Sequence, residues 1–78
     1  MTFLYDDEGD VLYAFFGNPT ESEYDQVGEG IYLRRDSQTD NYIGFMILNY
    51  SIRFVGKNAP VIPHFEKIGI PPLQEISF

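Results

Sequence analysis

The side chains best suited to chemistry in this sequence are one histidine and a short run of carboxylates. His64 is the single histidine, and it stands between Pro63 and Phe65 with Glu66 two positions after it. A nucleophilic site would pair such a base with a cysteine, or with a serine in a Gly-x-Ser-x-Gly turn. The chain contains no cysteine and no such turn. We therefore expect a structural histidine and no catalytic residues.

The acidic run Asp6-x-Glu8-x-Asp10 is similar in spacing to the start of a calcium-binding loop. Such a loop needs a glycine at its sixth position and a glutamate at its twelfth. Counted from Asp6, those positions hold Val11 and Gly17, so the match fails. A weak cation site on this turn stays open as an alternative. We expect no cofactor and no dedicated metal site, because a chain with one histidine and no cysteine would have to bind zinc through carboxylates.

Two further patterns are typical of binding sites, but structural roles suit them better. Gly28-x-Gly30 lacks the third glycine and the following helix of a dinucleotide-binding turn. Arg34 and Arg35 form a small basic patch beside Asp36, where we expect a salt bridge at a strand end in place of phosphate binding. Acid–base catalysis by carboxylates needs burial or close approach to separate their pKa values, and the acids here lie in polar turns. The sequence therefore favours a protein that is not an enzyme.

The elements that position these residues are expected to be β-strands. Aromatic residues make up 17% of the 78 residues, and alanine occurs only twice. Aromatic and β-branched residues favour strands, whereas good helix formers are scarce. Strands are predicted over residues 2–5, 11–16, 21–27, 31–35 and 42–50, with turns at 6–10 and 28–30. The acids on 21–27 are typical of an edge strand that resists unwanted pairing.

The expected fold class is mainly β, or small α+β. We predict an antiparallel meander of four to five strands in residues 1–54, followed by a proline-broken apolar tail in residues 55–78. At most one short helix is expected near the C-terminus, where residues 63–68 could form one turn between Pro63 and Gly69. The tail is apolar enough to pack on its own sheet or on a neighbouring chain.

The segment 42–50 is apolar on both faces of its predicted strand. Its side chains form two sets, Ile43, Phe45 and Ile47 on one face, and Met46, Leu48 and Tyr50 on the other. A strand with two apolar faces must be covered on both. In a single small sheet only one face of such a strand is covered. The tail or a second chain therefore has to cover the other face. We therefore expect a homo-oligomer or an obligate complex.

Charge is divided unevenly along the chain. The net charge is −7, and residues 1–33 hold eight acids and neither lysine nor arginine. This excess predicts that neither nucleic acid nor an anionic membrane is the partner, and it permits a basic protein. The N-terminus lacks the pattern of a signal peptide and no apolar run could span a bilayer, which favours a cytoplasmic protein. The candidate interaction surface consists of Phe45, Met46, Leu48, Tyr50, Glu21, Glu23 and Asp25.

Three motifs in a fixed order resemble a known family. They are YDDEGDVLY at residues 5–13, VGEGI at 27–31 and YIGFMIL at 42–48. Together they resemble the bacterial family catalogued as domain of unknown function 2283, whose members open with a Tyr-Asp-x-x-x-Asp-x-Leu-Tyr stretch. Gly9 stands where many members carry alanine, and the likeness covers residues 3 to about 54. The resemblance implies a small β-rich domain and no assigned activity.

No motif in the sequence identifies a function. The best hypothesis is a small protein-interaction or self-assembling module without enzymatic activity. The alternative is a small-molecule-binding or enzymatic domain with a pocket between the sheet and the tail. Copurification of a protein partner would favour the first hypothesis, and a bound metabolite would favour the second.

Overall fold

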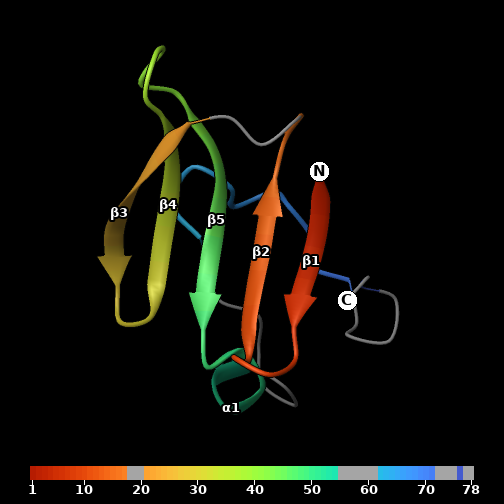
Figure 1. The fold of residues 1–78 in the computed structure, drawn as a ribbon. Helices are drawn as coiled ribbons and strands as arrows, with labels where there is room; N and C mark the ends of the chain where they lie inside the picture. Colours follow the sequence, from red (N-terminus) through yellow and green to blue (C-terminus); the bar gives the residue numbers. More distant parts are fainter. Residues whose placement is uncertain (18–20, 55–61, 72–75, 77–78) are drawn as a thin grey trace.

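Short, alternating apolar segments of the chain form strands that assemble into one antiparallel sheet. The computed structural model describes residues 1–17, 21–54, 62–71 and 76. Within these residues the elements are β1 (Thr2–Asp6), β2 (Val11–Phe15), β3 (Ser22–Gly28), β4 (Ile31–Asp36), β5 (Tyr42–Leu48) and α1 (Tyr50–Phe54) (Figure 1). The expected mainly β class, with four to five antiparallel strands and at most one short helix, is confirmed: the sheet has five strands, and one short helix follows them.

The strand order is β1-β2-β5-β4-β3. Strands β3, β4 and β5 follow one another as a meander, and the β1–β2 hairpin joins this meander by pairing β2 with β5. The two most apolar strands therefore lie side by side near the centre of the sheet (Figure 1). The acidic strand β3 lies at an edge, as its charges predict.

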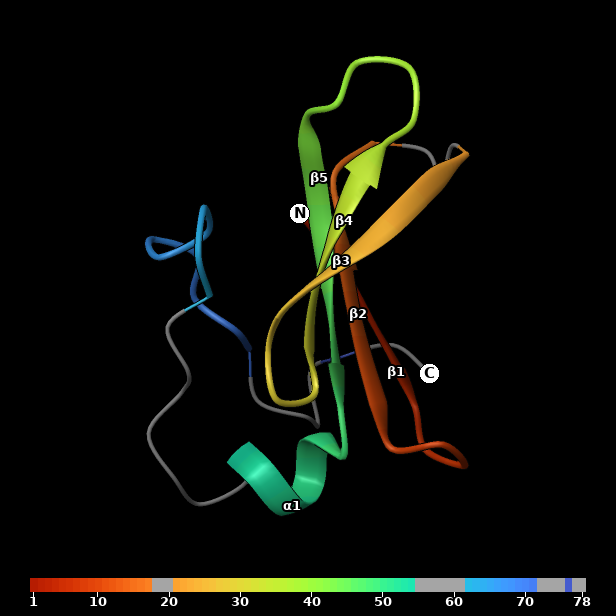
Figure 2. The same ribbon diagram turned by 90° about the vertical axis from the view of Figure 1, so that its left-hand side faces the viewer.

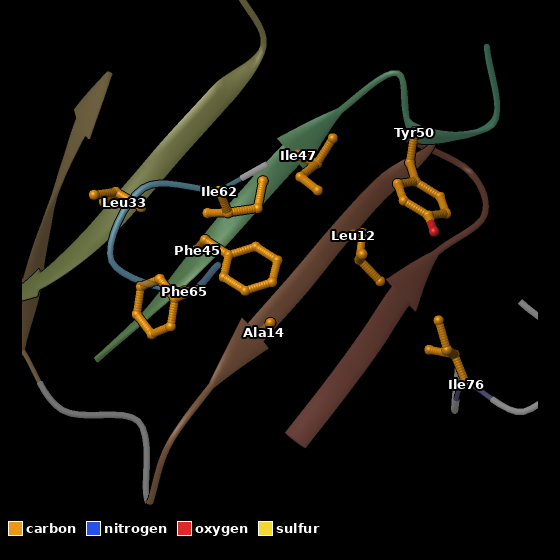
Figure 3. Packing of buried hydrophobic residues seen from close by; sticks show 9 residues of the cluster. All are labelled: Leu12, Ala14, Leu33, Phe45, Ile47, Tyr50, Ile62, Phe65 and Ile76. Atoms are coloured by element: carbon orange, nitrogen blue, oxygen red, sulfur yellow. The ribbon is translucent and has the colours of Figure 1, made fainter. Parts of the chain in front are cut away.

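Alternate side chains of the central strands point to one face and form the core. The cross-strand pairs Leu12–Ile47 and Ala14–Phe45 lie in register, and Leu33 pairs with Phe45 from the other side. Residues from beyond the strands complete the cluster, which consists of Leu12, Ala14, Leu33, Phe45, Ile47, Tyr50, Ile62, Phe65 and Ile76 (Figure 3). The described tail residues thus pack on their own sheet, and Figure 2 shows segment 62–71 and α1 on the same side of it.

The short helix lies earlier in the chain than Pro63 and Gly69 indicate. It spans Tyr50–Phe54, whereas residues 63–67 form turns and no helix. His64 explains this difference, because its φ of 67° belongs to the left-handed region and interrupts a right-handed helix. The prediction of a helical turn at 63–68 is therefore wrong.

The last part of the predicted strand 42–50 also differs. Strand β5 ends at Leu48, and Asn49 takes a φ of 53° that turns the chain into α1. Tyr50 then enters the core, where its ring centroid lies 6.2 Å from that of Tyr5. The prediction that Tyr50 shares a face with Met46 and Leu48 is wrong, because one left-handed residue ends the alternation.

A glycine at the centre of the sheet permits close packing of β2 and β5. A Cβ added at Gly44 would collide with the carbonyl oxygen of Ala14 and lie 2.8 Å from the Cα of Phe15. Real Cβ atoms do not approach backbone this closely, so any larger residue at position 44 would force these two strands apart.

Candidate functional site

The face of the sheet opposite segment 62–71, here called the outer face, is apolar and aromatic. Register places Leu4 beside Tyr13, Tyr13 beside Met46, and Met46 beside Tyr32, so that one row crosses four strands. These positions alternate with the core positions and therefore point to the other side. The side chains of the outer face on β1, β2, β4 and β5 include Leu4, Val11, Tyr13, Phe15, Tyr32, Arg34, Met46 and Leu48.

Solvent reaches part of this face. Leu4 is 39% exposed, and Tyr13, Tyr32 and Met46 are half-buried although they lie on the three inner strands. In the part of the chain that the structure describes, the tail segment and α1 lie on the other side of the sheet (Figure 2). The outer face is therefore a continuous apolar surface of the kind that marks interaction sites.

One cation lies on the outer face. The guanidinium carbon of Arg34 is 5.9 Å from the centroid of the Phe15 ring, within range of a cation–π interaction. Gly44 stands between these two residues in the register, and its missing side chain lets Arg34 reach across. The Nε of Arg34 also donates a hydrogen bond of 2.6 Å to Ser22 Oγ. The charge is thus held against the apolar surface at its rim.

The neighbouring Arg35 binds three carboxylates. Its nitrogens lie 2.8 Å from Glu23, 2.9 Å from Asp25 and 2.8 Å from Asp40. The hydrogen bond from Arg35 holds the pKa of Asp25 below its usual value, and the carboxylates raise the pKa of Arg35. The expected salt bridge at this strand end is confirmed. Two of the three acids in the candidate surface are therefore already paired with a cation of the same chain, and Glu21 is exposed.

The carboxylates of the β1–β2 turn bind the chain itself. Asp6 Oδ1 accepts hydrogen bonds from the backbone nitrogens of Glu8 and Gly9, at 3.1 and 3.2 Å. Such a side-chain-to-backbone turn explains an aspartate at this position without any ligand. Within the described ranges, no three His, Cys, Asp or Glu residues come close enough together to hold a metal ion.

Asp10 links this turn to the start of α1. Its carboxylate accepts hydrogen bonds from the Tyr5 hydroxyl at 2.6 Å, the Ser51 backbone nitrogen at 2.9 Å and the Ser51 hydroxyl at 2.7 Å. Partial burial alone would raise the pKa of Asp10, but these three donors outweigh it and lower the pKa. The same contact with Asp10 raises the pKa of Tyr5. Asp10 is thus a structural residue that fixes α1 to the sheet.

A cleft of about 890 Å³ opens between the sheet and the tail. Its lining consists of Phe16 directly after β2, residues 40–42 leading into β5, and residues 64–68. The rings of Tyr42 and His64 have centroids 4.7 Å apart, and those of Phe16 and Phe65 are stacked at 6.2 Å. His64, expected to be structural, therefore lies in the wall of a cleft.

The structure divides the candidate surface that the sequence indicated. Phe45 and Tyr50 are 2% and 8% exposed and belong to the core, so neither can contact a partner. Met46 and Leu48 lie on the outer face. The candidate surface from the sequence left out the aromatic residues that β2 adds to this face, although the unbroken apolar run at 11–15 places apolar side chains on both faces of that strand. The alternative hypothesis from the sequence placed a pocket between the sheet and the tail, and a cleft lies there. The sequence did not indicate which residues line this cleft, because three separate segments contribute them.

The fold and these surfaces define a small antiparallel β protein in which the described tail residues cover one face of the sheet and leave the other face partly accessible. No family model, curated protein or solved structure matches this chain. The resemblance to the family of unknown function therefore stays a hypothesis. No helix among the described residues combines the length and the apolar character needed to cross a bilayer.

Proposed function

We propose that this protein is a small interaction module without enzymatic activity, which self-associates through the outer face of its sheet. The observation that carries the proposal is the apolar row from Leu4 through Tyr13 and Met46 to Tyr32, on the side opposite the tail segment. Strands that are apolar on both faces are normally covered on both. The tail supplies one layer, and a second copy supplies the other.

The geometry suits sheet-on-sheet packing. Two sheets pack face to face at about 10 Å, with side chains from both inner faces forming the layer between them. A specific interface of standard size buries about 800 Å² on each partner. That area is about one-sixth of the chain's 5056 Å² of accessible surface.

The distribution of charge favours a second copy over a basic partner. The outer face carries Arg34 and aromatic side chains, whereas the carboxylates of Glu23, Asp25 and Asp40 surround Arg35. A basic partner would find no complementary charge on the apolar row. Each chain carries a net charge of −7, so two copies repel at long range, and salt screens that repulsion. Self-association should therefore strengthen with salt, whereas binding of a basic partner would weaken.

Analytical ultracentrifugation at low and moderate salt tests the proposal. The wild type should form a dimer at micromolar concentration, more completely at the higher salt. Met46→Asp, in the centre of the row, should be monomeric because it places an unpaired charge in a dry contact. Leu4→Asp, at the exposed end of the row, should weaken the dimer with little risk to the fold. Ile52→Asp is the matched control, since Ile52 is 71% exposed on α1 and should leave the dimer intact.

Circular dichroism should show the same β content in all variants. A wild type that sediments as a monomer at high micromolar concentration in moderate salt would overturn the proposal. So would a folded Met46→Asp variant that dimerises like the wild type. Copurification of a basic protein in stoichiometric amount, which dissociates as salt rises, would also overturn the proposal. It would show that the partner is a different protein and not a second copy of this chain.

A further inference from the structure

The cleft between sheet and tail has walls built of aromatic rings. Phe16 is 46% exposed and stacks on Phe65, while Tyr42 contacts His64. These rings come from three separate parts of the chain and line one cavity. The face of an aromatic ring carries negative electrostatic potential and attracts cations, and several rings around one space form a cage for an ammonium group.

The backbone at His64 is held in an unusual conformation. Its φ of 67° lies in the left-handed region, which histidine enters more often than most residues with a side chain, and its backbone N–H donates a hydrogen bond of 3.2 Å to the carboxylate of Glu66. This local contact fixes His64 where its ring meets Tyr42. His64 thus forms a fixed part of the cleft wall.

The charges next to the cleft favour a cation. Glu66 and Lys67 on its rim cancel each other. Asp40, also on the rim, shares the guanidinium of Arg35 with Glu23 and Asp25, so three carboxylates against one guanidinium leave two negative charges. The net charge of −7 adds a long-range attraction of the same sign.

We infer that this cleft binds an organic ammonium cation, with its methylated nitrogen against the rings of Phe16 and Tyr42. The site lies on the tail side of the sheet, so it is independent of self-association through the outer face. A neutral planar compound could use the rings as well, but it would gain nothing from the excess of negative charge.

Titration with choline, followed by proton–nitrogen correlation spectra at constant ionic strength, tests the inference. Saturable shifts should appear at residues 40–42 and 64–68, with weak affinity because the cleft is open. Dimethylbutanol, in which carbon replaces the quaternary nitrogen, should bind several-fold more weakly. A peptide with one trimethyllysine presents the same cation. Tighter binding of that peptide than of choline would assign the site to a protein side chain, and the reverse order would assign it to a free metabolite.

Three variants sharpen the result. Phe16→Ala should weaken choline binding about 2- to 5-fold, as expected for one exposed cation–π contact. Lys67→Gln should strengthen it about 2-fold by removing a like charge from the rim. Ile52→Ala, on α1 outside the cleft lining, should leave it unchanged.

Equal binding of choline and dimethylbutanol would overturn the inference, as would the absence of saturable shifts around the cleft. Ultracentrifugation of the same samples keeps the two proposals apart. A monomer that binds choline would refute only the proposed self-association, and a dimer that ignores choline would refute only the cation site.

Discussion

Replacement of Asp10 by alanine should destabilise the protein by weakening the link between the β1–β2 turn and α1. The carboxylate accepts three hydrogen bonds, one from Tyr5 and two from Ser51. It acts on α1 as a capping residue does, although it comes from a distant part of the sequence. Its own φ is 55°, a left-handed conformation that aspartate and asparagine tolerate better than alanine.

The expected loss is about 2–3 kcal/mol. Removal of a capping carboxylate costs about 1 kcal/mol. Holding alanine in the left-handed region adds about 1–2 kcal/mol. A chain of 78 residues has a typical stability of about 4–12 kcal/mol, so this loss is a large fraction of the total. Asp10→Asn keeps the backbone preference and one acceptor oxygen, and it should cost about 1 kcal/mol.

Urea unfolding followed by circular dichroism measures these values. With a slope of about 1 kcal/mol/M for a small protein, Asp10→Ala should lower the midpoint by about 2–3 M. Asp7→Ala is the matched control, because it removes an exposed carboxylate from the same turn. Equal midpoints for Asp7→Ala and Asp10→Ala would refute the reasoning.

The dependence on pH gives a second check on Asp10. Its pKa is lowered in the folded chain, so its ionised form stabilises the fold above the unfolded pKa of about 3.9. That contribution is lost as pH falls through the folded pKa. The difference in unfolding free energy between the wild type and Asp10→Asn should therefore shrink below about pH 3.9. A difference that stays constant down to strongly acidic pH would contradict this role.

Three further predictions concern the sheet and its titrating groups. Gly44→Ala should destabilise by about 1–3 kcal/mol in urea unfolding, because its Cβ would meet the Ala14 carbonyl. Arg35→Gln should raise the pKa of Asp25 toward its ordinary value in an NMR titration, since the hydrogen bond from Arg35 is what lowers it. Burial raises the pKa of Tyr50, so stability should fall as pH rises above about 10, the unfolded value. Tyr50→Phe should reduce that alkaline loss, and an unchanged alkaline profile would contradict the assignment.

Local patterns were enough to predict the strands. The apolar run at 11–15, the apolar residues at alternate positions 31 and 33, and the charge on 21–27 are all patterns among near neighbours in the chain, so the sequence alone contains that information. The same holds for the position of β3 at the edge. The sequence did not predict that two acids of the candidate surface are paired within the chain. Arg35 on the adjacent strand reaches both Glu23 and Asp25, and only the structure shows these contacts.

Tertiary structure decided which of two apolar strand faces is buried, where the chain turns, and which strands pair. The segment 42–48 is apolar on both faces, so only packing selects the face of Phe45 for the core and leaves the face of Met46 accessible. The left-handed backbone at Asn49 moves Tyr50 from a strand face into the core. The pairing of β2 with β5 and the assembly of the cleft join segments far apart in the chain. Such contacts depend on the summed burial of the whole sheet, which no local pattern contains.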